Sequence, residues 1–351
     1  MFDYHILVIA LGIICIWSST KNDAWQTKNK NKKYACIALC ILFITQAGFR
    51  DIVTSGDTFN YYNSYLDTEK TSWSELISSL LNPSSDYQGR DPGYKIFVKC
   101  TQSIWPNFLF FLNLVAAIAS IPICRILYRF TTSVAGIFMG AVLYESLFAP
   151  FFNTGIRQAL AMGFCFYALL LYYDRKSIYK WLPILLCAIS FHASAIVFIP
   201  MFIVMRLKNQ NRLLKLAIIV SPLVMLYASQ IVAYLGEGTI YEMYAIDSTD
   251  NLGTPVFTLL VFLSVLTIKY KAVWIQTVYP HSQIMFSSMI LALLLTPASW
   301  VDSNFIRTTF YYLAFLMPML SVIVDAYSVQ SRQYKTIFYA FLTLIFVYLT
   351  A

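Results

Sequence analysis

The chain has 351 residues, of which 59% are apolar and only 12% are charged. A soluble domain carries about 25% charged residues, so the composition excludes a soluble protein and predicts a helical bundle in a lipid bilayer. The net charge of +8 does not indicate nucleic-acid binding, because most of the excess lies in short loops between apolar runs, where it orients a membrane protein.

About twelve apolar runs follow one another along the chain. A helix needs ~20 residues to cross the hydrocarbon core, and several runs reach that length only if they extend by a turn. Since lipid cannot satisfy backbone hydrogen bonds, we expect helices throughout, forming one transmembrane domain over residues 1–351. The expected transmembrane or re-entrant helices lie near residues 4–18, 34–49, 107–124, 133–152, 157–173, 178–191, 193–205, 213–235, 255–268, 282–298, 305–325 and 336–350.

The first apolar run is expected to be a retained span. It begins with Met-Phe-Asp3 rather than a basic segment, and no small-residue cleavage motif follows, so a cleavable signal peptide is not predicted. The seven cysteines form no CxxC pair or histidine cluster, and most lie within apolar runs. We therefore expect buried free thiols, no metal and no cofactor.

Two polar segments interrupt the apolar pattern. Residues 50–93 are rich in Asp, Ser, Tyr and Asn and are expected to form a long loop, and residues 236–254 are expected to form a shorter acidic loop. Residues 94–106 end in Trp105-Pro106 and are expected to form an interfacial or re-entrant helix.

The segment 178–205 decides the orientation of the chain. It is either one long span or a hairpin of two short helices that turns at His192. Cytoplasmic loops carry an excess of Lys and Arg. Only the hairpin places most of the 25 basic residues on one side and most of the 17 acidic residues on the other. We therefore expect the hairpin, with both termini and both polar loops outside the cytoplasm.

Three arginines lie at the ends of spans on the predicted outer side, where basic residues are few. Arg50 follows the second span, and Arg157 and Arg307 open the fifth and the eleventh. The start of a helix presents free N–H groups and partial positive charge, and a guanidinium adds a bidentate phosphate clamp. Two such helix ends would bind a diphosphate, and Asp57 or His192 would accept a proton from a nearby nucleophile.

Each of these residues also has a purely structural interpretation. An arginine near the membrane surface commonly anchors its helix to headgroup phosphates. Asp57 is typical of a turn or cap, and Asp91-Pro92-Gly93-Tyr94 is by itself an ordinary turn with a tyrosine anchor. A histidine such as His192 in an apolar run often makes a structural hydrogen bond, although ionisable residues at membrane depth tend to be functional.

Five motifs occur in a fixed order along the chain. They are Gly48-Phe49-Arg50-Asp51, Gly56-Asp57-Thr58 with Tyr61 and Tyr62, Asp91-Pro92-Gly93-Tyr94, Arg157-Gln158-Ala159-Leu160-Ala161 and Phe191-His192-Ala193-Ser194-Ala195. Their order and spacing resemble the EpsG-like family of Wzy-type polymerases of bacterial exopolysaccharide, capsule and O-antigen. The resemblance extends roughly from residue 34 to residue 325. Asp91 departs from it, since the family more often has Glu before Pro-Gly-Tyr.

The resemblance implies a glycosyltransferase of the bacterial cytoplasmic membrane with a GT-C-like helical bundle. Such a protein transfers a growing glycan from undecaprenyl diphosphate onto the sugar of a new lipid-linked repeat unit at the outer face. It needs neither a metal nor a nucleotide sugar. The implied partners are the lipid-linked glycan, membrane lipid, a flippase and a chain-length regulator, without nucleic acid.

For that activity, Arg157, Arg307 and Arg50 would neutralise the charge that develops on the leaving diphosphate. Asp57 and His192 are the first candidates for the base, with Asp57 slightly favoured, and Asp51 and Asp302 remain open. The loop 50–93 would cover the glycan. The expected diphosphate-binding or glycan-binding residues are Arg50, Asp51, Gln158, Tyr61, Tyr62, Tyr94 and Tyr311.

Two other functions stay open. A ligase would move the glycan to another acceptor, and its loss would leave long lipid-linked polymer instead of single repeats. A flippase or transporter would not be an enzyme. Transporters often have two related halves and charges near the bilayer midplane, whereas no convincing repeat occurs here and the polar residues gather at one predicted face. A membrane acyltransferase is weaker still, because His192 has no partner beside it in the sequence.

Overall fold

The structure is a computed structural model that describes residues 28–52, 56–81, 91–131, 133–207, 210–227, 230, 281–300 and 306–327. Within these residues every element is a helix and no strand occurs, which confirms the predicted all-helical fold. The expected spans near 4–18, 255–268 and 336–350, and the loop 236–254, lie outside the described residues.

Two described helices are long and apolar enough to cross a bilayer, α6 (Phe108–Phe130) and α9 (Ile156–Tyr173). A helix rises 1.5 Å per residue, so the 18 residues of α9 extend about 27 Å, close to the ~30 Å of a hydrocarbon core. Shorter apolar helices cover Gly136–Glu145, Ile178–Phe191, Ala193–Val204 and Gln283–Leu295. These helices support a membrane protein, and the number of about twelve spans remains a prediction.

The chain divides into two compact units. The first includes Ala24–Arg129 and Ala141–Ile196, and the second includes Phe130–Gly140 and Val197–Ala351. The candidate site described below lies entirely within the first unit.

The core of the first unit is formed by long apolar helices that approach one another closely. α9 packs along α10 (Ile178–Phe191). A Cβ atom on Gly163 of α9 would lie 2.9 Å from the carbonyl carbon of Ile118, so only glycine allows α9 and α6 to cross this closely. Phe43 of α2 (Lys28–Gly48) stacks on Tyr144 of α7 (Val134–Leu147), with ring centroids 3.8 Å apart.

α9 ends in a tight turn that leads directly into α10. Arg175 adopts a left-handed backbone conformation with φ of 54°, and the Lys176 N–H donates to the carbonyl of Leu171 at 3.0 Å, which closes the helix end. Arg129 at the end of α6 forms an ion pair with Asp174, Nη1 to Oδ1, at 2.5 Å. This end of α9 therefore carries basic residues, and Arg157 lies at the opposite end.

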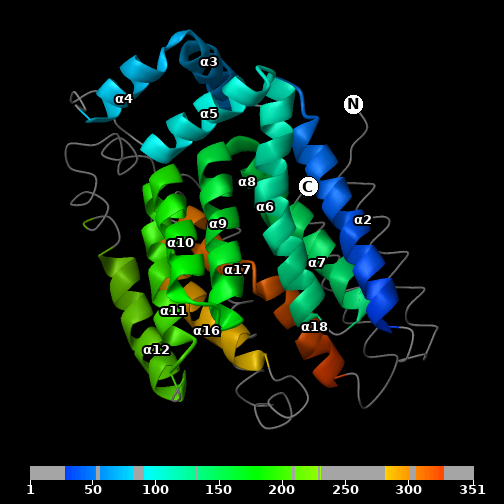
Figure 1. The fold of residues 1–351 in the computed structure, drawn as a ribbon. Helices are drawn as coiled ribbons and strands as arrows, with labels where there is room; N and C mark the ends of the chain where they lie inside the picture. Colours follow the sequence, from blue (N-terminus) through cyan, green and yellow to red (C-terminus); the bar gives the residue numbers. More distant parts are fainter. Residues whose placement is uncertain are drawn as a thin grey trace. The chain divides into compact units, whose positions relative to one another are not determined.

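Three helices lie across one end of α6, α9 and α10 (Figure 1). They are α3 (Gly56–Lys70), α4 (Trp73–Leu81) and α5 (Pro92–Ile104). α5 corresponds to the helix predicted over 94–106, whereas α3 and α4 occupy a segment for which the sequence predicted a loop. α4 begins with a capping box: the Glu75 N–H donates to Ser72 Oγ at 3.2 Å, and the Ser72 N–H donates to Glu75 Oε2 at 2.7 Å.

The helix break predicted at His192 is present. α10 ends at Phe191, and His192 is extended, with φ of −159° and ψ of 122°. A 3₁₀ helix, η4 (Ala193–Phe198), and α11 (Ile199–Val204) follow. The segment 178–205 is therefore two helical pieces and not one continuous helix.

The second unit is also helical in its described part. Its described elements are α12 (Gln210–Leu226), α16 (Ser282–Leu295), η6 (Thr296–Trp300), α17 (Ile306–Leu313) and α18 (Leu316–Tyr327). Gln210 Nε2 donates to Ser287 Oγ at 2.6 Å and joins α12 to α16. Ser288 Oγ donates to the carbonyl of Tyr312 at 2.9 Å and joins α16 to α17.

Candidate active site

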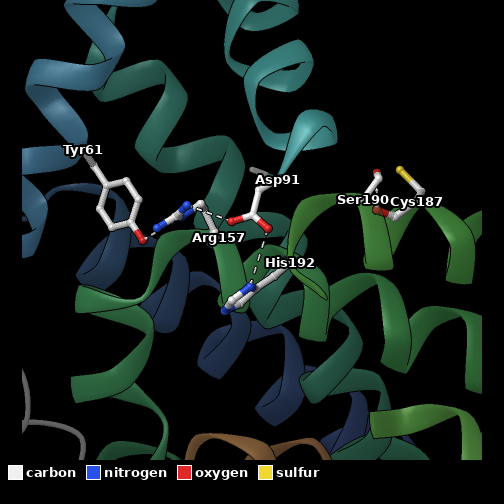
Figure 2. Close-up of polar contacts among 6 residues, drawn as sticks. All are labelled: Tyr61, Asp91, Arg157, Cys187, Ser190 and His192. Carbon is white, nitrogen blue, oxygen red and sulfur yellow. Dashed lines mark hydrogen bonds and ion pairs between the residues drawn. The ribbon is translucent and has the colours of Figure 1, made fainter. Parts of the chain in front are cut away.

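A buried carboxylate lies between two basic side chains at the start of α5. The Asp91 side chain is 3% exposed, and its Oδ2 lies 2.8 Å from Nη1 of Arg157. Its other oxygen, Oδ1, lies 3.8 Å from Nδ1 of His192 (Figure 2). The start of α5 thus brings together residues from the beginning of α9 and the end of α10.

The backbone at Asp91 shows that this carboxylate is not used as a helix cap. Asp91 occupies the N-cap position of α5 in a left-handed conformation, with φ of 52° and ψ of 59°. An aspartate at this position commonly accepts a hydrogen bond from the first turn of its helix. Here it makes no side-chain cap hydrogen bond, and the carboxylate turns to Arg157 instead. The interpretation of Asp91 as an ordinary turn residue is therefore incomplete.

The glycine of the same motif explains why Asp91 lies near His192. A Cβ atom on Gly93 would lie 2.9 Å from the carbonyl carbon of Ser190, so the start of α5 approaches the last turn of α10 more closely than any other residue type allows. Ser190 Oγ donates to the carbonyl of Cys187 at 2.7 Å, and His192 follows two residues later (Figure 2). The close contact of the two helix ends fixes the separation of the carboxylate and the imidazole.

Arg157 is held by an acid and an aromatic ring. Besides its ion pair with Asp91, its Nε donates to the hydroxyl of Tyr61 at 3.5 Å, and its Cζ lies 5.8 Å from the centre of that ring. Tyr61 comes from α3 and meets the ring of Tyr94 edge to face, with centroids 5.9 Å apart. The Arg157 side chain is still 30% exposed, so part of the guanidinium is open to a ligand.

Arg50 is more deeply buried than Arg157, and its charge is less well compensated. It follows the end of α2 and is 9% exposed. Its Nη1 donates to the carbonyl of Ala47 at 2.5 Å, while Nε and Nη2 have no hydrogen-bond partner. Burial lowers the pKa of the Arg50 guanidinium to about 10, and the nearby hydroxyls of Tyr94, Tyr144 and Tyr61 act in the opposite direction. Arg50 is charged at neutral pH and retains unused donors.

Tyr94 supplies a protonated hydroxyl beside these arginines. It is 5% exposed, and its hydroxyl has no hydrogen-bond partner. Burial raises the pKa of Tyr94 above the usual value for tyrosine, and the neighbouring Tyr61 acts in the same direction. A buried phenol without a partner is costly to maintain, so its hydroxyl is available to a ligand.

A second buried acid in the first unit is hydrogen-bonded to the last turn of α2. Glu145 of α7 is 1% exposed, and its Oε2 accepts a hydrogen bond from Nε2 of Gln46 at 2.8 Å. Gln46 lies in the last turn of α2, four residues before Arg50. Glu145 was not predicted as a site residue, although an acid inside an apolar run is a recognised signal of function in membrane proteins.

The other predicted residues of the first unit lie around this cluster or away from it. Asp57 is exposed in the first turn of α3 and makes no ion pair or hydrogen bond with Arg157 or His192, and Asp51 is exposed as well. Tyr62 packs edge to face on Phe108, with centroids 5.0 Å apart. Gln158 is buried in α9.

Arg307 and Tyr311 belong to the second unit. Arg307 is exposed at the start of α17, and Tyr311 is buried against Phe198, with ring centroids 6.0 Å apart. Asp302 lies outside the described residues. Among the described residues, no group of three or more His, Cys, Asp or Glu side chains is arranged to hold a metal ion.

Comparison with known proteins identifies the family of the chain. No curated protein and no solved structure matches it. The EpsG family matches residues 33–351, nearly the whole length of the chain. This match confirms the relationship that the order of the five motifs predicted, and the chain belongs to the EpsG family.

Proposed function

We propose that the chain polymerises lipid-linked oligosaccharide repeat units into a surface polysaccharide. The donor is the growing glycan on undecaprenyl diphosphate, and the acceptor is a sugar hydroxyl of a new lipid-linked unit. Membership of the EpsG family supports a role in polysaccharide biosynthesis at a membrane. The reaction is that of a glycosyltransferase that uses a lipid diphosphate and needs no metal, and the GT-C-like architecture belongs to this proposal.

The observation that carries the proposal is the set of buried polar groups around Asp91, together with the buried Arg50, two of whose nitrogen atoms have no hydrogen-bond partner. A departing diphosphate develops negative charge, and preorganised donors aimed at that charge lower the barrier. Nε and Nη2 of Arg50 and the hydroxyl of Tyr94 are buried donors without a protein acceptor. Phosphate oxygens would satisfy them, and Arg157 would add the exposed part of its guanidinium.

The geometry favours His192 over Asp57 as the base. In the reaction, the acceptor oxygen bonds to the anomeric carbon, the bond from that carbon to the diphosphate oxygen breaks, and its electron pair leaves with the diphosphate. The acceptor proton must pass to a group near the arginines. His192 lies in the cluster with a side chain 14% exposed, whereas Asp57 is exposed on α3 and makes no hydrogen bond or ion pair with Arg157.

The cluster lies at one end of the first unit, which suits a reaction at a membrane surface. Arg157 begins α9, and the basic residues Arg175 and Lys176 follow the other end of that helix, about 27 Å away. Cytoplasmic ends of spans are rich in such residues. We therefore assign the cluster to the extracytoplasmic face of the bacterial cytoplasmic membrane, where α3 and α4 would cover the glycan and a flippase would deliver the repeat units.

The test is the length of the glycan made by cells that carry variants of the chain. Arg50→Ala and Arg157→Ala should abolish long polymer, and single lipid-linked repeats should accumulate. Lys70→Ala is the control, because Lys70 is 79% exposed on α3 and pairs only with Asp67 at the surface. Normal polymer length in both arginine variants would refute the proposal. Long lipid-linked polymer in the variants would indicate a ligase, and single repeats trapped in the inner leaflet would indicate a flippase.

A further inference from the structure

The carboxylate of Asp91 touches both groups to which the proposed function gives a role. One oxygen pairs with Arg157 at 2.8 Å, and the other lies 3.8 Å from Nδ1 of His192. These residues lie at the ends of three different helices, α5, α9 and α10, and the side chains of Arg157 and His192 point toward the carboxylate (Figure 2). A surface role cannot explain Asp91, because its side chain is 3% exposed.

The fold maintains this arrangement at a cost in backbone conformation. Asp91 keeps a left-handed backbone that non-glycine residues adopt infrequently, and it forgoes the cap hydrogen bond that its position offers. Gly93 permits the close contact with Ser190 that brings the carboxylate to His192. Local strain of this kind persists only where the surrounding structure imposes it, and such positions cluster at functional sites.

We propose that Asp91 is a positioning residue of the transferase, which rests on the proposed function. It orients His192 so that the imidazole accepts the proton of the acceptor hydroxyl, and its ion pair with Arg157 holds the carboxylate in place for that role. When Nδ1–H of a histidine donates to a carboxylate, the ring is fixed in the tautomer whose Nε2 carries the free lone pair.

The two distances suggest how substrate would complete the arrangement. At 3.8 Å, Nδ1 of His192 is beyond hydrogen-bond reach of Asp91, and this nitrogen has no hydrogen-bond partner. Catalytic hydrogen bonds are often long before substrate binds. A diphosphate that accepts hydrogen bonds from Arg157 would weaken the 2.8 Å ion pair between Arg157 and Asp91. The Asp91 carboxylate could then move within hydrogen-bond distance of Nδ1 of His192.

The transfer then needs no reactant other than the acceptor and the lipid-linked donor. The acceptor oxygen forms the new glycosidic bond, and its proton passes to Nε2 of His192. The electron pair of the broken bond leaves on the lipid diphosphate beside Arg157. The imidazolium that forms is stabilised by the carboxylate of Asp91, which remains ionised throughout.

The experiment is a set of variants at Asp91 and His192 in the purified full-length chain. The chain is placed in lipid nanodiscs with lipid diphosphate-linked repeat units extracted from a strain that lacks it. The rates measured are those of lipid diphosphate release and of glycan elongation. If the wild type gives neither product, the proposed function fails, and this result is distinct from a failure of the role of Asp91.

We expect Asp91→Asn to lower kcat by about 10–100-fold, the usual effect of losing a carboxylate that orients a functional histidine. KM of Asp91→Asn should change by less than about threefold, because the variant impairs proton transfer to His192 and leaves substrate binding intact. His192→Gln should lower kcat at least as much, and the double variant should be no slower than His192→Gln alone. Asp67→Asn removes an exposed carboxylate of α3 and should leave kcat unchanged.

Three outcomes would overturn the assignment. The first is a wild-type kcat in Asp91→Asn, and the second is a double variant whose loss equals the product of the two single losses. Asp91→Glu retains a carboxylate and should keep several-fold more activity than Asp91→Asn, so equal activity in the two also contradicts the proposal. If Asp91→Asn is not recovered as folded protein, Asp91→Glu and its double variant with His192→Gln provide the same comparison.

Discussion

Two buried charges of the site differ in how they are compensated. Asp91 pairs with Arg157 at 2.8 Å, so these two charges largely neutralise each other. Arg50 is also buried, but two of its nitrogen atoms have no hydrogen-bond partner. A buried cation that lacks partners costs several kcal/mol, and such a cost is recovered when an anion binds. Arg50 is therefore the residue of the site whose buried charge would be stabilised most by a negatively charged ligand.

Replacing Arg50 should weaken the reaction even when positive charge is kept. Arg50→Lys retains the charge but loses the planar set of donors, and we expect kcat/KM for the lipid-linked substrate to fall about 10-fold or more. Arg50→Ala should lower kcat by roughly 100-fold, as when one donor to a developing anion is removed. The rate of lipid diphosphate release measures both effects. Arg129→Lys is the matched control, because Arg129 pairs with Asp174 at the other end of α9, and equal losses at the two positions would argue against an anion at Arg50.

Part of this site could be predicted from single residues, and part could not. Arg157, His192, Tyr61 and Tyr94 were selected from the sequence, and the structure brings them together around Asp91. The contact of Asp91 with Arg157 was not predicted, because an aspartate before proline has the same local signature whether it caps a helix or binds a distant arginine. That distinction depends on a contact between residues 66 positions apart.

At the scale of helices, the site depends on the contact between the start of α5 and the end of α10. Gly93 is the point of closest approach, since a side chain there would lie 2.9 Å from the carbonyl carbon of Ser190. Neither helix can shift alone without moving Asp91 or His192. The contact therefore links the packing of the helices to the geometry of the site.

Gly93→Ala should separate the two helix ends while leaving every polar residue of the site in place. We expect a loss of about 1–3 kcal/mol in stability, as for other overpacked contacts, and a lower kcat because Asp91 moves away from His192. Thermal unfolding and the rate of glycan elongation measure the two effects. Ser190→Ala alone should be close to wild type, and it should restore Gly93→Ala only partly, because the backbone carbonyl of Ser190 remains. Wild-type stability in Gly93→Ala would contradict a close contact between α5 and α10 at this position.

The helices themselves could be predicted to different degrees. Apolar runs identified α6, α9 and α10, and the charge distribution identified the break at His192. α3 was missed because it is largely polar, and its buried face rests on widely spaced residues such as Thr58 and Tyr65. The start of α4 had a local signal in Ser72 and Glu75, whose spacing is that of a capping box.

At the scale of the whole chain, composition predicts a membrane protein, and the placement of charge predicts its orientation. In the first unit, the candidate site and the basic turn at Arg175 lie at opposite ends of α9. That separation is what a bilayer would impose on a site outside the cytoplasm and a basic loop within it. The division into two units was not predicted, because apolar periodicity carries no information about which helices pack together.

A native cysteine allows this orientation to be tested. Of the described cysteines, Cys100 is the exposed one, and it lies on α5 at the predicted outer face. A maleimide that cannot cross membranes should therefore label intact spheroplasts at Cys100, and Cys100→Ser should remove that label. Lys176→Cys in the Cys100→Ser background is the matched control, since Lys176 is exposed in the basic turn after α9. Lys176→Cys should be labelled only after the membrane is opened. If Cys100 needs an opened membrane and Lys176→Cys is labelled in intact spheroplasts, the Asp91 cluster lies on the cytoplasmic side, where flipped lipid-linked repeats do not reach it.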